Sequence, residues 1–182
     1  FGTLILQGSA VFGHLNITST GNLTMEVGAN ITVQNDFYCA NTTFLTNHTS
    51  VLGNLIADTG CTLTVVGAKT LTVNGNVTIN SGAVVNVTAG STVVTLSTTQ
   101  LNGILSISSG SWINLTLNDG KNTKQTILGQ NIFVSNVNSV PALPSAGDKL
   151  IGKFSNISSG SNAFALLNIS YTSADISVVN ES

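Results

Sequence analysis

Short stretches in which every second residue is apolar recur along most of the chain. Clear examples are residues 23–27, 71–73, 77–79 and 113–117, and Gly or Asn-Gly separates many of them. A two-residue period places the apolar side chains on one face, as in a half-buried β-strand. The connections are too short for helices, and no segment shows a convincing 3.6-residue period. The pattern therefore predicts an all-β fold.

These stretches also repeat with a longer period of about 20 residues, which is within the range of solenoid proteins. Three series can be followed along the chain, starting at Leu4/Leu6, Val11/Phe12 and Leu15/Ile17. Three short strands per repeat are typical of a parallel β-helix, or β-solenoid, in which each coil stacks on the one before. We expect about six coils over residues 1–138. A β-sandwich assembled by donor strands is the alternative fold, because sandwiches also combine short strands with regular turns.

The pattern changes after residue 138. Pro141 and Pro144 interrupt it, and three further strands of irregular spacing are predicted at 150–154, 164–171 and 176–179. A solenoid needs a terminal unit over its open apolar end. Residues 139–182 are therefore expected to form an irregular β cap or the joint to a next unit.

Two segments resemble a known group of proteins. The run GNVTINSGAVVNV at residues 75–87 resembles the repeats of surface β-helix proteins such as autotransporter passengers and filamentous adhesins, and the tail from Gly147 to Ile176 is similar to their terminal strands. The resemblance implies an extracellular parallel β-helix. It implies no defined activity, because this fold carries many functions.

Charge is scarce throughout the 182 residues. The chain has five Lys, no Arg, and seven Asp and Glu, which leaves a net charge of -2. Nucleic-acid binding by phosphate neutralisation needs a basic stripe that is missing here. A polybasic membrane-binding patch is missing too, and no apolar run approaches the ~20 residues of a transmembrane helix. No signal peptide is visible at Phe1, so we expect a mature product or an excised segment.

The most distinctive motif is the N-glycosylation sequon, Asn-x-Ser/Thr. With 22 Asn and 45 Ser plus Thr, chance alone would give roughly five sequons, and the chain has eleven. They begin at Asn16, Asn22, Asn30, Asn41, Asn47, Asn76, Asn86, Asn114, Asn156, Asn168 and Asn180. For a secreted eukaryotic or archaeal protein this density predicts N-linked glycans, which would also supply solubility.

Strand alternation offers a competing explanation for these sequons. Eight of the eleven have Ile, Leu or Val in the middle, as an outward Asn, an inward aliphatic residue and an outward hydroxyl would produce. The same alternation would leave these asparagines accessible. Asn41, Asn47 and Asn180 are not explained in this way. A bacterial source would favour this explanation over glycosylation.

The two cysteines, Cys39 and Cys61, are separated by close to one repeat, and Asp36 and Asp58 have the same spacing. If this spacing is one repeat, the cysteines lie on adjacent coils, where strand spacing brings Cα atoms within disulfide reach. An even pair in an extracellular chain predicts a disulfide. Two stacked free thiols in the core are the alternative.

The remaining candidates for chemistry are few. Asp36 and Asp58 could stack as the two carboxylates that glycoside hydrolysis needs, but the other acidic residues are isolated and Arg is absent. His14 and His48 lie near no Cys at ligand spacing and are expected in loops or on the surface. Trp112, the only Trp, falls in an apolar series and is expected in the core. We therefore expect no enzyme, no metal site and no cofactor.

The function expected from these features is structural. The chain would be a subunit or segment of an extracellular, N-glycosylated fibre, surface appendage or cell coat, with copies of itself as partners. Its first strand carries no charge that would deter pairing, so Leu4 and Leu6 are the expected assembly residues. An adhesin or carbohydrate-binding module, with a surface carbohydrate as partner, is the alternative. A polysaccharide-degrading enzyme is the third hypothesis.

Overall fold

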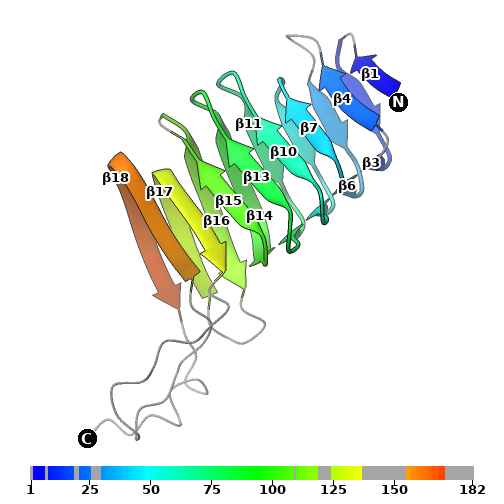
Figure 1. Ribbon diagram of the computed structural model, residues 1–182. Coiled ribbons are helices and arrows are strands. Elements are labelled where there is room, and N and C mark those ends of the chain that lie inside the picture. The colour runs from blue at the N-terminus through cyan, green and yellow to red at the C-terminus, as the bar shows by residue number, and fades with distance from the viewer. Residues whose placement is uncertain are drawn as a thin grey trace, which may run out of the picture.

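The computed structural model describes residues 2–6, 8–18, 21–25, 30–108, 110–118, 124–136 and 155–170. Within these ranges the protein consists of β-strands without a helix, and most of them stack in parallel as a β-solenoid of about five turns (Figure 1). The predicted fold is thereby confirmed. The β-sandwich alternative is not adopted.

Each turn contributes a strand to three faces. The first face contains β1 (Gly2–Leu6), β4 (Gly21–Met25), β7 (Thr42–Leu45), β10 (Thr62–Val65), β13 (Val84–Val87) and β15 (Ile104–Ile107). Passing from the first of these six strands to the last takes five turns of the solenoid. The sequence predicted about six coils.

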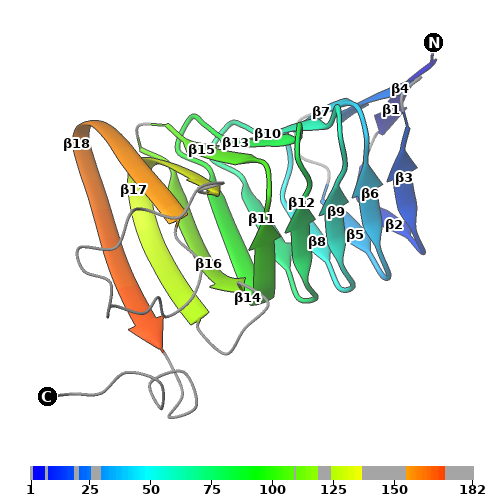
Figure 2. The same ribbon diagram turned by 60° about the horizontal axis from the view of Figure 1, so that its bottom comes forward.

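The other two faces are built in the same way. The second contains β2 (Ala10–Phe12), β5 (Ile31–Val33), β8 (Thr49–Val51), β11 (Thr70–Val73) and the first parts of β14 (Thr92–Leu101) and β16 (Trp112–Asn118). The third contains β3 (Leu15–Ile17), β6 (Phe37–Cys39), β9 (Leu55–Ala57), β12 (Val77–Ile79) and the last parts of β14 and β16 (Figure 2).

The core is a set of apolar columns along the solenoid axis. In β5 and β12 the outer two of three residues are buried and the middle Thr is half-buried, as the two-residue period predicts. Stacking in register places like residues over one another, so Val33, Val51 and Val73 form one buried column. Each fully buried aliphatic side chain contributes roughly 1.5–3 kcal/mol. The columns therefore hold the coils together.

Glycine is required where successive corners meet. A Cβ on Gly75 would lie 2.4 Å from the carbonyl oxygen of Gly53 in the preceding turn, and a Cβ on Gly53 would lie equally close to the carbonyl oxygen of Asn35. A Cβ at such a distance would force the backbone of the neighbouring turn to shift, so glycine is favoured at these two positions. This close approach explains the glycine punctuation between the second and third faces.

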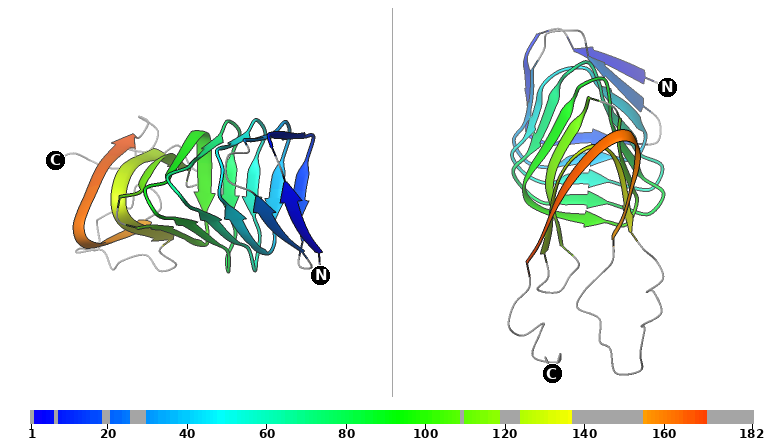
Figure 3. Two further views of the ribbon diagram at one scale, coloured as in Figure 1. Left: turned by 90° about the horizontal axis from the view of Figure 1, so that it is seen from above. Right: turned by 90° about the vertical axis from the view of Figure 1, so that its left-hand side faces the viewer.

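The parallel stack ends at β16. The next strand, β17 (Lys124–Asn136), runs antiparallel to β15 and β16, and β18 (Ser155–Ser170) runs antiparallel to β17. These two strands form one end of the solenoid, opposite the N-terminal strands (Figure 3). The sequence had placed residues up to 138 in parallel coils. A two-residue period is the same in either strand direction, so alternation alone could not detect the reversal.

The predicted C-terminal strands correspond only in part to the structure. The strand predicted at 164–171 falls mostly within β18, which begins earlier, at Ser155. The strands predicted at 150–154 and 176–179 lie outside the described residues.

Candidate functional site

The outer surface carries most of the sequon asparagines, as alternation predicts. In the first of them, Asn16 and Thr18 are exposed and Ile17 between them is buried. Asn30, Asn76, Asn114 and Asn168 are also exposed, and Asn86 is half-buried. The hydroxyl residue of a sequon is recognised together with its Asn, so an outward pair suits a glycan acceptor.

These outward asparagines are spread around the solenoid. Asn86 lies on the first face, Asn30 and Asn114 belong to the second, and Asn16 and Asn76 belong to the third. Each face therefore presents at least one sequon to solvent.

The other sequons are placed differently. Asn41 is half-buried just before β7, and its Oδ1 accepts a hydrogen bond from the Thr42 backbone N–H at 2.8 Å. Asn47 is only 1% exposed, so it does not face outward in the folded chain. Asn22 lies on β4 and Asn156 on β18, whereas Asn180 lies outside the described residues.

A ladder of polar side chains follows the corner before the third face. His14 Nδ1 accepts a hydrogen bond from the Asp36 backbone N–H at 3.4 Å. Asp36 Oδ1 accepts from both the backbone N–H and Nδ2 of Asn54, each at 2.9 Å, and Asn54 Oδ1 accepts from the Asn76 N–H at 2.9 Å. The ladder satisfies backbone donors at the corner, where the chain leaves regular strand pairing.

Asn76 combines this structural role with a sequon. Its Oδ1 accepts hydrogen bonds from Ser97 Oγ at 2.7 Å and Thr98 Oγ1 at 3.0 Å. These contacts use the amide oxygen, whereas an N-linked glycan is attached to the amide nitrogen. The ladder is thus compatible with modification at Asn76.

A second polar cluster lies at the other end of the third face. Tyr38 donates its hydroxyl proton to Asp58 Oδ2, and Asp58 Oδ1 accepts from the Thr59 N–H at 2.8 Å and from Asn80 Nδ2 at 3.0 Å. The Tyr38 hydroxyl is the main reason that the pKa of Asp58 lies below its ordinary value of 3.8, and the Thr59 and Asn80 donors act in the same direction. The same hydrogen bond raises the pKa of Tyr38 above 10.0.

The two aspartates do not stack, contrary to the register that their spacing suggested. Phe37 pairs with Leu55, so the step from β6 to β9 is shorter than the step from Asp36 to Asp58. Asp36 precedes β6 and Asp58 follows β9, at opposite ends of the strand pair. The extra residues of extended chain span about 13 Å. This exceeds the separation of roughly 5–10 Å that glycoside hydrolysis uses, so the proposed carboxylate pair is not formed.

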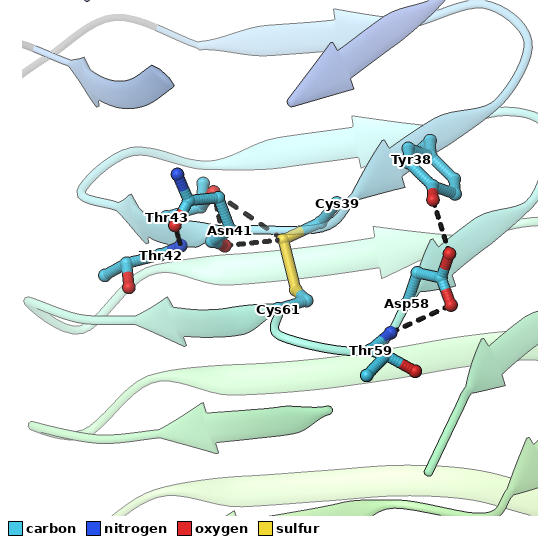
Figure 4. Close-up of a disulfide and its surroundings, with 8 residues drawn as sticks. All are labelled: Tyr38, Cys39, Asn41, Thr42, Thr43, Asp58, Thr59 and Cys61. Atoms are coloured by element: carbon cyan, nitrogen blue, oxygen red, sulfur yellow. Dashed lines mark hydrogen bonds between the residues drawn. A yellow bond between two sulfur atoms is a disulfide. The ribbon is translucent and has the colours of Figure 1, made fainter. Parts of the chain in front are cut away.

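The predicted disulfide is confirmed, but the two cysteines are not paired residues of stacked strands, as their spacing suggested. Cys39 and Cys61 are bonded, with Cα atoms 5.5 Å apart, and both are buried (Figure 4). Cys39 ends β6, whereas Cys61 precedes Thr62, which pairs with Thr42 one turn earlier. The bond therefore crosses diagonally between neighbouring turns at the corner from the third face to the first.

Trp112 does not lie in the core, and this corrects the sequence expectation. It is 37% exposed, and the neighbouring Ile113 is the buried residue. Adjacent residues of a strand point to opposite faces, so only one of the two can face inward. The Trp112 ring lies 6.0 Å from that of Phe164 on β18, centroid to centroid. The chain therefore has an exposed aromatic pair near its C-terminal end.

Both histidines are exposed, as predicted, and His48 Nδ1 accepts a hydrogen bond from the Thr70 N–H at 3.2 Å. Across the part of the chain that the structure describes, no three His, Cys, Asp or Glu side chains gather as metal ligands. None of the described segments is a helix long and apolar enough to span a membrane.

The two ends of the stack expose strand edges. Among the described residues, β2 pairs only with β5 and β3 only with β6 at the N-terminal end, and β18 pairs only with β17 at the other. The predicted assembly residues Leu4 and Leu6 lie on β1, aligned with Leu23 and Met25 of β4. At the opposite end, β18 displays Phe164, Leu166 and Leu167, all exposed. The sequence predicted a cap or a joint in residues 139–182 but not the exposure of these three side chains.

No protein-family model, curated protein or solved structure matches the chain.

Proposed function

We propose that the chain is a structural building block of an extracellular, N-glycosylated fibre, surface appendage or cell coat, and that it assembles end to end. The observation that carries this proposal is the division of the surface. Sequons occur on all three faces, whereas uncharged strand edges occur at the two ends.

Glycans on the faces would oppose side-by-side association. An N-linked glycan is bulky and hydrophilic. With acceptors such as Asn86, Asn114 and Asn16 on different faces, no face would remain bare for lateral packing. The glycans would also provide the solubility that the few charges cannot.

Within the described residues, the strands at the two ends lack the side chains by which proteins commonly protect strand edges. Charged side chains, especially Lys, and prolines normally block such edges. The strands β1, β2 and β3 contain neither, and β18 contains neither along its 16 residues. Unprotected edges at both ends favour association through those ends.

An extracellular setting is supported by the disulfide, because such bonds persist mainly outside the reducing cytosol. The resemblance of residues 75–87 to adhesin and autotransporter-passenger repeats points to the same setting. It suggests a surface protein of that type.

Mass spectrometry of the chain secreted from a eukaryotic host tests whether the sequons carry glycans. We expect glycans at Asn76, Asn86 and Asn114. Thr78→Ala is the matched variant, because it removes one sequon and keeps the Asn76 side chain in its ladder. Bare peptides at all three sites would contradict the proposal.

Negative-stain microscopy of the same material tests assembly. We expect linear filaments one molecule wide, and removal of the glycans should make them bundle. Monodisperse monomers at every concentration would overturn the proposed function.

Carbohydrate binding is a second candidate, favoured by the exposed Trp112–Phe164 pair. Sugars commonly stack on exposed aromatic rings, whose faces combine apolar area with a polar quadrupole. Trp112→Ala should then abolish binding on a glycan array. Phe44→Ala is the matched control, because Phe44 is also exposed but lies on β7. Unchanged binding by Trp112→Ala would exclude this site.

A further inference from the structure

The last strand, β18, retraces the path of the last coil. Ser135 of β17 pairs with Ile104 on one side and Asn156 on the other, and Gln130 pairs with Trp112 and Phe164. Two antiparallel pairings in succession restore the original direction. The offset from Ile104 to Asn156 equals the offset from Trp112 to Phe164. The strand β18 therefore runs parallel to β15 and β16 and keeps a constant register with them.

The inward positions also continue into β18. Leu115, Ile127 and Leu167 occupy one column through β16, β17 and β18. The first two are buried, whereas Leu167 is 43% exposed. It is a core position whose outer neighbour is missing from the described residues. The end of β18 is thus a rung of the solenoid with an uncovered surface.

The N-terminal rung fits this position in register. One unbroken column of paired residues leads from Val11 to Leu166, through Thr32, Ser50, Thr72, Val94, Asn114 and Leu128. Both ends of the column are apolar and strongly exposed, Val11 at 66% and Leu166 at 56%. On the inward side of the same strands, Phe12 is the counterpart of Leu167.

We propose that β18 of one copy pairs in parallel with β2 and β3 of a second copy, with Leu166 opposite Val11 and Leu167 opposite Phe12. The proposal rests on the self-assembly put forward above and specifies its joint. It shifts the main contact from Leu4 and Leu6 on β1 to the β2–β3 rung and its acceptor β18.

A second copy suits this edge better than an unrelated strand. It presents a preformed rung with the correct direction, register and inward apolar residues, so little ordering has to occur on binding. Neither edge contains a charge that would be buried unpaired. Each joint also leaves the same two edges free at the ends of the pair. A heterologous contact of this kind produces an open filament.

Cysteine cross-linking tests the register. Neighbouring strands hold paired Cα atoms about 5 Å apart, within disulfide reach. Mixing a Val11→Cys chain with a Leu166→Cys chain should give disulfide-linked heterodimers on mild oxidation. A chain with both changes should give a ladder of oligomers on non-reducing gels. Leu96→Cys replaces Leu166→Cys in the control, because Leu96 is as exposed as Val11 but lies on β14, between the two ends.

Introducing a charge into the apolar contact tests the joint without new covalent bonds. Leu167→Asp should abolish filaments, because the carboxylate would be buried between copies, and it should leave the monomer folded since Leu167 is exposed there. Leu166→Asp is the neighbouring control; its side chain faces outward at the joint, so the loss should be smaller. Circular dichroism verifies folding of both variants.

The outcomes separate the joint from the proposed function. Heterodimers in the mixture and a ladder from the double variant support the joint. If the unmodified chain forms filaments but the cysteine variants do not cross-link, the joint is overturned and the proposed function is left intact. Dimers from Leu166→Cys alone mean that β18 pairs with itself, which also overturns the joint. If the unmodified chain remains monomeric, both proposals fail.

Discussion

The coils and the terminal strand follow the same alternating pattern, yet they differ in what they bury. Between β5 and β16 each rung lies between two others, and inward residues such as Leu63 and Ile113 are buried. On β18 the inward Leu167 remains exposed, and the outward Phe164 and Leu166 are apolar where the coils mostly carry Thr or Asn. Burial in a solenoid therefore depends on having a neighbour on both sides. Three exposed apolar side chains, Phe164, Leu166 and Leu167, gather on this end strand, whereas exposed ones on the coils, such as Phe44 and Leu96, lie on separate strands.

The largest effect that sharpens this comparison is expected from matched Phe→Ala changes. Phe37 on β6 is fully buried, so Phe37→Ala should lower the free energy of unfolding by about 3–5 kcal/mol. Phe164 is exposed on β18, so Phe164→Ala should cost well below that amount. Urea titration followed by circular dichroism measures both. Equal losses would mean that β18 is as well buried as the coils.

The disulfide is expected to contribute nearly as much to the coils. Cys39 and Cys61 close a loop of 22 residues, for which the chain-entropy relation gives about 3 kcal/mol. The double change Cys39→Ala with Cys61→Ala should lower stability by that amount. Hydrogen exchange should report faster opening of β6 and β10 than of β17. Faster exchange at β17 instead would contradict the local role of the bond.

Two glycines at equivalent corners compare an inner turn with the first one. At Gly75 an added Cβ meets the Gly53 carbonyl oxygen at 2.4 Å, whereas at Gly13 no atom lies within 4 Å. Gly75→Ala should therefore cost about 1–3 kcal/mol through overpacking. Gly13→Ala should be close to neutral, because no preceding turn exists there among the described residues. Denaturant midpoints of the two variants, measured on monomers, compare their stabilities. A loss of stability for Gly13→Ala as large as that for Gly75→Ala would contradict an uncovered first turn.

The sequence predicted what depends on local alternation and on the approximate repeat. That was sufficient for the all-β class, the parallel coils and the disulfide between Cys39 and Cys61. The length of each turn was not predictable, because corners absorb a variable number of residues. The step from Phe37 to its partner Leu55 is shorter than the next step, from Leu55 to Val77. The supposed stacking of Asp36 on Asp58 failed for this reason.

The polar corner left a signal in the sequence that could have been found. Asp36, Asn54 and Asn76 follow one another at the same unequal steps as the strands after them. Short polar side chains that recur with the repeat are typical of ladders that cap backbone groups. The orientation of Trp112 was less accessible, since both Trp112 and Ile113 are apolar and the local pattern does not say which one faces inward.

The smallest expected effect concerns Asp58, whose hydrogen bonds to Tyr38 and Asn80 link three successive coils and have no counterpart among the described contacts of β18. The folded state holds the pKa of Asp58 below 3.8, mainly through the Tyr38 hydroxyl. The unfolded chain therefore binds a proton at a higher pH than the folded chain does. The stabilisation is present above about pH 4 and is lost as the pH falls through the folded pKa.

Tyr38→Phe removes the main cause of the pKa shift of Asp58, and Asp58→Asn removes the titrating group. In urea titrations between about pH 2 and pH 5, both variants should lose less stability on acidification than the unmodified chain. An unchanged acid dependence in both would show that the carboxylate contributes nothing to holding the coils together.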